Sequence, residues 1–223
     1  MHMSVSDSSS VQTDLLPRLE PLAARYDHLI VDLWGTLHNG IPQLPGAVEC
    51  LAAFKAAGTG VALLSNAPFR VSGVRTVLDQ IGIPDTIYDG IFCSGEVAWH
   101  AIRKREDAWH SKLGRRAAFI GPDRHRPMLD NPGIDGEAEI AEADFVICTG
   151  PRDMGHTLEM YLPELEAAAA RGLPMVCTNP DREVLRGDAR EICAGAMAEA
   201  YESRMGGDVA WHGKPYRPVF DEV

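Results

Sequence analysis

The stretch IVDLWGTLHNG, residues 30–40, decides the fold because it runs from an apolar segment straight into a turn. Residues 27–33 are apolar and rich in β-branched side chains, which favours a buried strand. Asp32 stands where that strand is expected to end, and Trp34 follows two residues later. A lone carboxylate at a strand end is also common as a turn or capping residue. Its role therefore depends on what the rest of the chain brings beside it.

Strand-like and helix-like segments alternate along the chain. Strands are predicted at 27–33, 61–65, 90–93, 117–120, 145–148, 175–177 and 209–211, and helices at 15–25, 44–57, 68–81, 96–105, 158–171, 193–203 and from 214 onward. This alternation is typical of a parallel α/β sheet with right-handed crossovers. The alternation of strands and helices restarts near residue 115, which indicates a second, smaller α/β unit.

The predicted fold class is α/β, with a Rossmann-like parallel-sheet core domain and a smaller inserted α/β cap domain. The core is expected in two parts, residues 1–93 and 192–223, and the cap at residues 94–191. The strand at 209–211 is expected in the core sheet. Only the start of a helix follows it before Val223, so the core is expected to be incomplete at its C-terminal end.

Composition narrows the class of protein. The 223 residues are 45% hydrophobic and 24% charged, with a formal net charge of −11 and no basic stripe, which argues against a nucleic-acid partner. No apolar run approaches the roughly 20 residues of a membrane span, and the N-terminus has no secretory-signal pattern. Residues 8–10 are expected to be a disordered lead-in. Five scattered cysteines without a CxxC pair predict reduced thiols in a cytoplasmic protein.

Three predicted strand ends carry reactive or charged side chains. Asp32 follows the first, Ser65 and Asn66 follow the second, and the last leads into Lys214. Ligands gather at the carboxyl ends of strands in open α/β sheets. A nucleophilic carboxylate, a hydroxyl with backbone N–H groups and a cation suit phosphoryl transfer through an aspartyl-phosphate. Taken singly, Ser65-Asn66 also suits an N-cap and Lys214 a solvated surface residue, so only the combination favours a phosphate site.

These residues fall in three short motifs, DLWGTL at 32–37, LLSNAP at 63–68 and HGKP at 212–215. In this order they resemble the motifs of the haloacid dehalogenase superfamily of hydrolases. The separation of Ser65 from Lys214, 214 − 65 = 149 residues, leaves room for a cap domain. The sequence is most similar to the class IIA branch, which includes nitrophenylphosphatase-like, phosphoglycolate and pyridoxal phosphate phosphatases.

The resemblance implies a Mg²⁺-dependent hydrolase, a phosphomonoester phosphatase that acts through an aspartyl-phosphate on a small phosphorylated metabolite. Asp32 matches the nucleophile and a metal ligand, and the backbone carbonyl of Trp34 a second metal ligand. Ser65 and Lys214 match the other catalytic residues, and the cap is expected as a homodimer surface. The phosphate- and substrate-binding residues are expected to be Leu33, Trp34, Asn66, Asn179 and Asp181. Asn179 and Asp181 would serve equally well as a turn before a helix.

The sequence departs from the family pattern in two places. Trp34 stands where the phosphatases have a second aspartate, whose acid–base help is worth roughly 10²- to 10⁴-fold and which an indole cannot supply. A slow enzyme, replacement by His38, or a phosphate-ligand-binding or scaffold protein without turnover all stay open, as does carbon–halogen or carbon–phosphorus cleavage. The second departure is that no GDxxxxD-like run follows Lys214. Mg²⁺ would then have few protein ligands, and the chain as given is expected to be a fragment or shortened form that is inactive.

Overall fold

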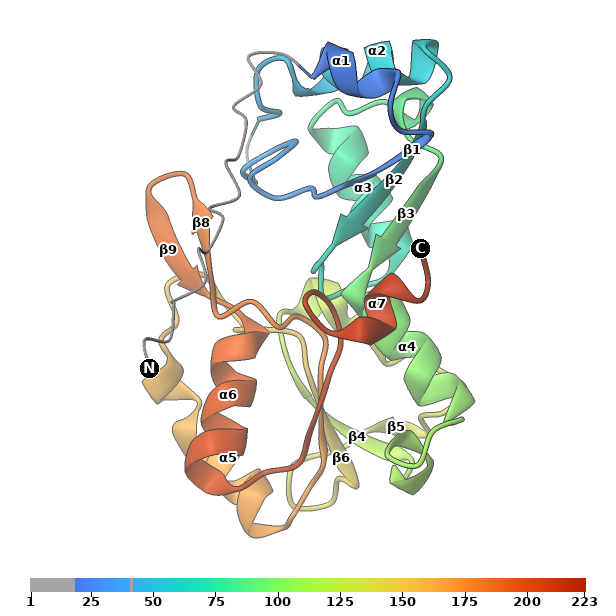
Figure 1. Cartoon of the computed structure of the whole chain (residues 1–223). Coiled ribbons are helices and arrows are strands. Elements are labelled where there is room, and N and C mark those ends of the chain that lie inside the picture. Colours follow the sequence, from blue (N-terminus) through green and yellow to red (C-terminus); the bar gives the residue numbers. More distant parts are fainter. Residues whose placement is uncertain (1–18, 41) are drawn as a thin grey trace, which may run out of the picture.

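The computed structural model describes residues 19–40 and 42–223. Figure 1 shows two bodies, one above the other: the upper is built on a three-stranded sheet and the lower on a five-stranded sheet. The expected lead-in at residues 8–10 and the first part of the helix expected at 15–25 lie outside the described residues. Within them, α1 covers Glu20–Ala23.

The first sheet has the order β1-β2-β3, and both of its pairings are parallel, as the alternation of strands and helices predicts. Its strands and helices are β1 (His28–Val31), α2 (Ala47–Ala56), β2 (Gly60–Ser65), α3 (Val71–Gln80) and β3 (Gly90–Cys93). A 3-10 turn at Asp85–Ile87 precedes β3. The helices cover one face of the sheet through a buried apolar cluster that includes Leu33, Leu51, Leu63, Val74, Leu78 and Ile91.

The opposite face of this sheet packs on two further helices, α4 (Ser94–Lys104) and α7 (Arg217–Phe220). Successive side chains of a strand point to opposite faces. Leu63 therefore joins the first cluster, while Leu64 packs with Val97 of α4 and Val219 of α7. Because α4 begins immediately after β3, one helix leads directly from the first body into the second.

The second sheet has the order β10-β7-β6-β4-β5, with every pairing parallel. Its strands are β4 (Arg116–Ile120), β5 (Gly136–Glu137), β6 (Phe145–Cys148), β7 (Met175–Cys177) and β10 (Val209–Trp211). α4 covers one face, and α5 (Leu162–Ala170) and α6 (Ala194–Met205) cover the other. Short 3-10 turns lie at His110–Lys112, Asp123–Met128 and Leu158–Met160.

The expectation that residues 209–211 join the first sheet is wrong. β10 pairs with β7, with Val209 opposite Met175 and Trp211 opposite Cys177. The physical reason is the right-handed strand–helix–strand crossover: α6 returns the chain to the edge of the sheet that it has just left. A three-residue apolar strand does not indicate which of two sheets it will join. The domain boundaries expected at 93/94 and 191/192 stay a prediction.

A second feature that the sequence analysis missed is an antiparallel hairpin, β8 (Glu183–Arg186) and β9 (Ala189–Ile192). Arg186 pairs with Ala189 across a two-residue turn, Gly187-Asp188, in which Gly187 has φ +58°. A Gly-Asp pair between two runs of alternating residues is a hairpin signal. The sequence therefore contained the information, and Figure 1 shows the hairpin projecting from the second body beside the first.

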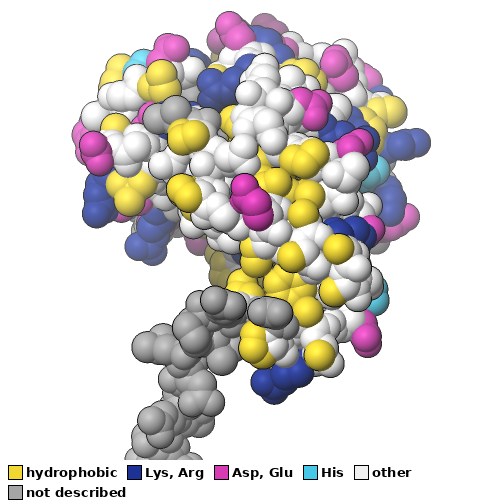
Figure 2. All heavy atoms as spheres, turned by 90° about the horizontal axis from the view of Figure 1, so that it is seen from above, with side chains coloured by type: hydrophobic (Ala, Val, Ile, Leu, Met, Phe, Trp, Pro, Cys, Tyr) yellow, Lys and Arg dark blue, Asp and Glu magenta, His cyan; other side chains and the backbone are white. Residues whose placement is uncertain are grey.

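β1 is an edge strand of the first sheet, and its outward residues are exposed. Ile30 is 58% exposed, and Leu19 and Tyr26 are also large, exposed apolar residues. Figure 2, which views the molecule from above, shows hydrophobic side chains gathered in one area of that surface. Among the described residues, no helix has the length and apolar character needed to cross a membrane.

Candidate active site

The centre of the site is an ion pair between the two bodies. Asp32 directly follows β1, and Lys214 follows β10. Lys214 Nζ lies 2.5 Å from Asp32 Oδ1 and also donates to the carbonyl oxygen of Leu64 at 3.0 Å. The Asp32 side chain is 44% exposed, and its Oδ2 accepts no hydrogen bond from a described residue. One carboxylate oxygen is therefore neutralised by a cation while the other faces the cleft.

Ser65 and Asn66 stand beside this pair at the end of β2. Ser65 is 7% exposed, and its Oγ accepts a hydrogen bond from the N–H of Ala67 at 3.1 Å. Asn66 is 8% exposed, and its side chain contacts the backbone of Lys214 and the carboxylate of Asp181. Parallel strands place Asp32, Ser65 and Asn66 at one edge of the sheet, and Lys214 reaches the same edge from the second body.

The loop after Asp32 is a tight turn. The carbonyl oxygen of Leu33 accepts hydrogen bonds from the N–H groups of Leu37 and His38, at 2.8 and 3.2 Å. Gly35 has φ +80°, a conformation that glycine adopts without strain. This turn brings His38 back beside Trp34, and their ring centroids are 5.4 Å apart.

Trp34 contacts the β8–β9 hairpin instead of standing free in the cleft. Its Nε1 donates to the carbonyl oxygen of Leu185 at 2.9 Å, and the Arg186 guanidinium lies over its ring, 5.0 Å from the centroid. Arg186 also donates to the carbonyl oxygen of Gly40 at 3.3 Å. The single N–H of the indole is therefore used by the hairpin, and Trp34 connects the two bodies.

His38 is 5% exposed, and its Nδ1 accepts a hydrogen bond from the N–H of Gly40 at 3.1 Å. Burial lowers the pKa of His38; the charge of Asp32 opposes this shift and that of Arg186 adds to it. A neutral imidazole whose Nδ1 accepts a hydrogen bond carries its proton on Nε2. His38 can then donate a hydrogen bond into the cleft, but this tautomer has no free lone pair with which to act as a base.

The structure brings Asn179 and Asp181 to the same cleft, in the loop after β7. Asn179 Oδ1 accepts a hydrogen bond from the N–H of Asp181 at 2.9 Å, and Asp181 Oδ1 accepts one from Asn66 Nδ2, also at 2.9 Å. Burial raises the pKa of Asp181, against the opposing effects of the Asn66 hydrogen bond and the Lys214 charge, while the charge of Asp32 adds to the rise.

The cleft between the bodies has a volume of about 1120 Å³ and is lined by all the residues named so far as candidates. It is also lined by residues that the sequence analysis did not single out, among them Arg124, His125 and Thr149. His125 is 5% exposed, its Nδ1 lies 3.1 Å from Thr149 Oγ1, and its ring packs on Phe69. Burial, together with the charge of Arg124, lowers the pKa of His125 to about 3. No sequence motif marks these residues, because their proximity depends on how the second sheet docks.

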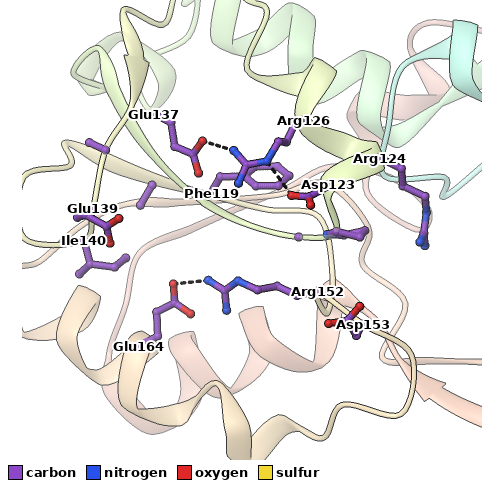
Figure 3. Close-up of a pocket in the computed structure, with 14 residues that line it drawn as sticks. Phe119, Asp123, Arg124, Arg126, Glu137, Glu139, Ile140, Arg152, Asp153 and Glu164 are labelled. Atoms are coloured by element: carbon purple, nitrogen blue, oxygen red, sulfur yellow. Dashed lines mark hydrogen bonds and ion pairs between the residues drawn. The ribbon is translucent and has the colours of Figure 1, made fainter.

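Figure 3 shows a second pocket, of about 580 Å³, on the second body. Two of its arginines are engaged by acids: Arg126 pairs with Glu137 and Asp123, and Arg152 pairs with Glu164 at 2.6 Å. Arg124 lies at the margin of this view and points away from the Arg126–Glu137 pair. The charges of Arg126 and Arg152 are therefore already balanced by acids that line the same pocket.

The described residues supply few ligands for a metal ion. No group of three or more His, Cys, Asp or Glu side chains suited to a metal occurs within residues 19–40 and 42–223. The carboxylate of Asp32, which lines the cleft, is a hard oxygen donor. Mg²⁺ usually keeps several waters and binds through one or two carboxylates plus substrate phosphate oxygens. The donor set is thus compatible with Mg²⁺ held jointly by protein and substrate.

Comparison with known proteins identifies the family. A model of haloacid dehalogenase-like hydrolases matches residues 29–135. A crystal structure of a haloacid dehalogenase-like hydrolase from Brucella suis 1330 is 35% identical, with a TM-score of 0.84, over 93% of this chain and 73% of that one. The chain belongs to the haloacid dehalogenase-like hydrolase family, so the family resemblance and the α/β fold class predicted from sequence are confirmed. A search of curated proteins gives no significant match.

More distant structures share the fold. A 4-nitrophenylphosphatase from Thermotoga maritima is 22% identical with a TM-score of 0.66, over 90% of this chain and 73% of that one. A glycerol phosphate phosphatase from Mycobacterium tuberculosis, in complex with magnesium, is 22% identical with a TM-score of 0.66, over 90% of this chain and 59% of that one. The chain therefore spans between 59% and 73% of the length of these two proteins.

Proposed function

We propose that this hydrolase is a phosphomonoester phosphatase that acts through an aspartyl-phosphate at Asp32. The observation that carries the proposal is the 2.5 Å contact of Lys214 with Asp32, at strand ends where Ser65 lines the same cleft. A carboxylate with one oxygen paired to a cation and the other free is poised to attack phosphorus. The phosphatases among the structures of the same fold add support.

In the proposed reaction, Asp32 Oδ2 attacks phosphorus and the bond from phosphorus to the leaving oxygen breaks. The Ser65 hydroxyl and the backbone N–H of Asn66 bind the phosphoryl oxygens, and Lys214 offsets their charge. Leu33 and Trp34 contribute their backbone to this phosphate site. Water then attacks the aspartyl-phosphate, releases inorganic phosphate and regenerates the carboxylate. The leaving oxygen takes its proton from water, because the indole N–H of Trp34 is bonded to Leu185.

We propose Mg²⁺ as the cofactor, held by Asp32, the carbonyl group of Trp34, waters and the substrate phosphate. When bound, it would neutralise phosphate charge and orient the phosphoryl group for in-line attack. The magnesium complex of the Mycobacterium tuberculosis relative supports this choice of metal.

The substrate would be a small phosphorylated metabolite, since a cleft of about 1120 Å³ holds more than a phosphate group. The second body would act as the cap that excludes water from the strand ends. We further propose homodimerisation through this cap, which size-exclusion chromatography with light scattering would test. A cytoplasmic location is supported by the five cysteines, all of them free thiols.

The test is phosphate release from p-nitrophenyl phosphate and a panel of phosphomonoesters, with and without Mg²⁺. Asp32→Asn is the matched variant, because asparagine lacks the nucleophilic carboxylate and has nearly the same side-chain shape as aspartate. Turnover that depends on Mg²⁺ and falls by roughly 10³-fold or more in Asp32→Asn is the expected result. With beryllium fluoride, the wild-type protein should also show the ¹⁹F resonance of a protein-bound adduct, and the variant should not.

Two results would argue against the proposal. Equal phosphate release by wild type and Asp32→Asn would remove Asp32 from the reaction. Binding of inorganic phosphate without turnover across the panel, and without a beryllium fluoride adduct, would instead favour a phosphate-binding protein on the same fold.

A further inference from the structure

The side chain of Asn66 forms three hydrogen bonds that link two distant segments. Its Nδ2 donates to Asp181 Oδ1 at 2.9 Å and to the carbonyl oxygen of Lys214 at 3.1 Å. Its Oδ1 accepts from the N–H of Lys214 at 2.7 Å. Asn66 is 8% exposed, so these bonds form largely away from solvent. The amide therefore joins the loop after β7 to the backbone of the catalytic cation.

The Asn66 amide bonds to both the N–H and the carbonyl oxygen of Lys214, as one strand residue bonds to its partner in a β-sheet. These two bonds fix the main chain from which the Lys214 side chain extends to Asp32. Gly213 permits this close approach: it has φ +117°, and a Cβ atom there would lie 2.6 Å from Asn66 Oδ1. Only glycine therefore brings this backbone so near to the Asn66 side chain.

Asp181 and the backbone of Lys214 together fix the orientation of the Asn66 amide. An ionised carboxylate only accepts hydrogen bonds, and a backbone N–H only donates them. If the amide were flipped, its NH₂ group would face the N–H of Lys214 and its oxygen would face Asp181. Both contacts would then be repulsive. Asp181 is itself held in place, because its N–H donates to Asn179 and its carbonyl oxygen accepts from Gly195 at the start of α6.

We infer that Asp181 and Asn66 are positioning residues that set Lys214 against Asp32. The carboxylate orients the amide, the amide holds the Lys214 backbone, and the ammonium group of Lys214 then reaches the nucleophile. The position of the β7–β8 loop is in this way coupled to the charge beside Asp32. The catalytic consequence rests on the proposed phosphatase function, whereas the positioning itself does not.

The test compares Asp181→Leu with Asp181→Asn. Leucine cannot accept a hydrogen bond from Asn66, whereas asparagine can do so through its own Oδ1. The first readout is acetylation of Lys214 by acetic anhydride at fixed pH, quantified by mass spectrometry. Lys55 is an internal reference in the same protein, because its side chain is also 26% exposed and paired to one aspartate.

The Lys214-to-Lys55 labelling ratio should rise about threefold or more in Asp181→Leu, since one net hydrogen bond is lost. In Asp181→Asn it should stay close to wild type. Asp153→Leu is the control, because Asp153 lines the same cleft without contacting Asn66 or Lys214. The second readout is kcat, which should fall about 10- to 100-fold in Asp181→Leu from misplacement of the cation, and recover in Asp181→Asn.

An unchanged labelling ratio in Asp181→Leu would overturn the inference. So would equal losses of kcat in the leucine and asparagine variants, since a proton-donating Asp181 would tolerate neither. If Asp181→Leu does not fold, as judged by its thermal transition, Asn66→Ala must raise Lys214 labelling in its place. If the wild type releases no phosphate, the phosphatase proposal fails while the labelling ratio still decides the positioning role.

Discussion

Lys214 Nζ contacts Asp32 Oδ1 at 2.5 Å, although 182 residues separate the two positions in the chain. Asp32 follows the edge strand of the first sheet and Lys214 follows the edge strand of the second. The ion pair therefore forms only when the two bodies dock. With the carboxylate in one body and its cation in the other, the geometry of the pair depends on the relative position of the two bodies.

Trp34 should make turnover depend strongly on the leaving group. Without a residue to protonate the departing oxygen, p-nitrophenyl phosphate should be hydrolysed much faster than an alkyl phosphate such as glycerol phosphate. Trp34→Asp supplies a carboxyl group and should narrow that ratio by roughly 10²-fold. Trp34→Asn removes the ring without adding an acid, so equal ratios in the two variants would contradict the prediction. The measurement is kcat/KM for both substrates.

Trp34 should also hold the β8–β9 hairpin against the first body. Trp34→Phe removes the hydrogen bond to Leu185, worth about 0.5–1.5 kcal/mol, and keeps an aromatic ring beneath Arg186. Amide hydrogen exchange across residues 183–192 should accelerate by about 2- to 10-fold. Trp99→Phe removes a comparable bond, from indole Nε1 to the carbonyl oxygen of Asp130 at 3.2 Å, and should leave this hairpin unaffected. Equal rates of amide exchange across residues 183–192 in the two variants would contradict a stabilising contact between Trp34 and the hairpin.

Gly213 and Gly206 offer a matched pair for testing the approach of the Lys214 backbone. Both have positive φ, +117° and +70°, but a Cβ at Gly206 would meet nothing within 4 Å. Gly206→Ala should cost about 1–2 kcal/mol of backbone strain alone. Gly213→Ala should cost about 1–3 kcal/mol more, because it also displaces Asn66. Chemical denaturation gives both values, and Lys214 acetylation should rise only in Gly213→Ala. Equal costs in the two variants would show that the clash is relieved elsewhere.

Two buried histidines should make the protein less stable below neutral pH. Burial lowers the pKa of His125 to about 3 and that of His212 to about 4. In the unfolded chain both titrate near 6.5, so below that pH the unfolded state binds more protons than the folded state. Their contribution is fully present above pH 6.5 and is lost as the pH falls from there toward 4 and 3.

Between pH 6 and pH 5 the free energy of unfolding should fall by about 2 kcal/mol from these two groups together. His125→Gln and His212→Gln should each remove about half of that slope, and the double variant nearly all of it. Urea denaturation at half-unit pH steps measures it. An unchanged slope in the double variant would show that carboxylates dominate the acid sensitivity.

Much of the site could be predicted because strand ends are visible in local patterns. A short β-branched run followed by polar residues marked Asp32 and Ser65, and parallel strands necessarily bring such ends to one edge. Lys214 was also identified, but its strand was assigned to the wrong sheet. Local propensity describes what a segment forms and not which neighbour it pairs with. The crossover through α6 determined that pairing.

By itself, the sequence determined the α/β class, the parallel arrangement of short strands and the candidate site residues Asp32, Ser65 and Lys214. These depend on periodicity and on residue type, which act over a few neighbouring positions. Only the tertiary structure decided that Trp34 bonds to Leu185 and that Asn66 joins Asp181 to Lys214. Those contacts bridge 115 to 151 positions along the chain. They exist because two sheets dock, and no local pattern records that docking.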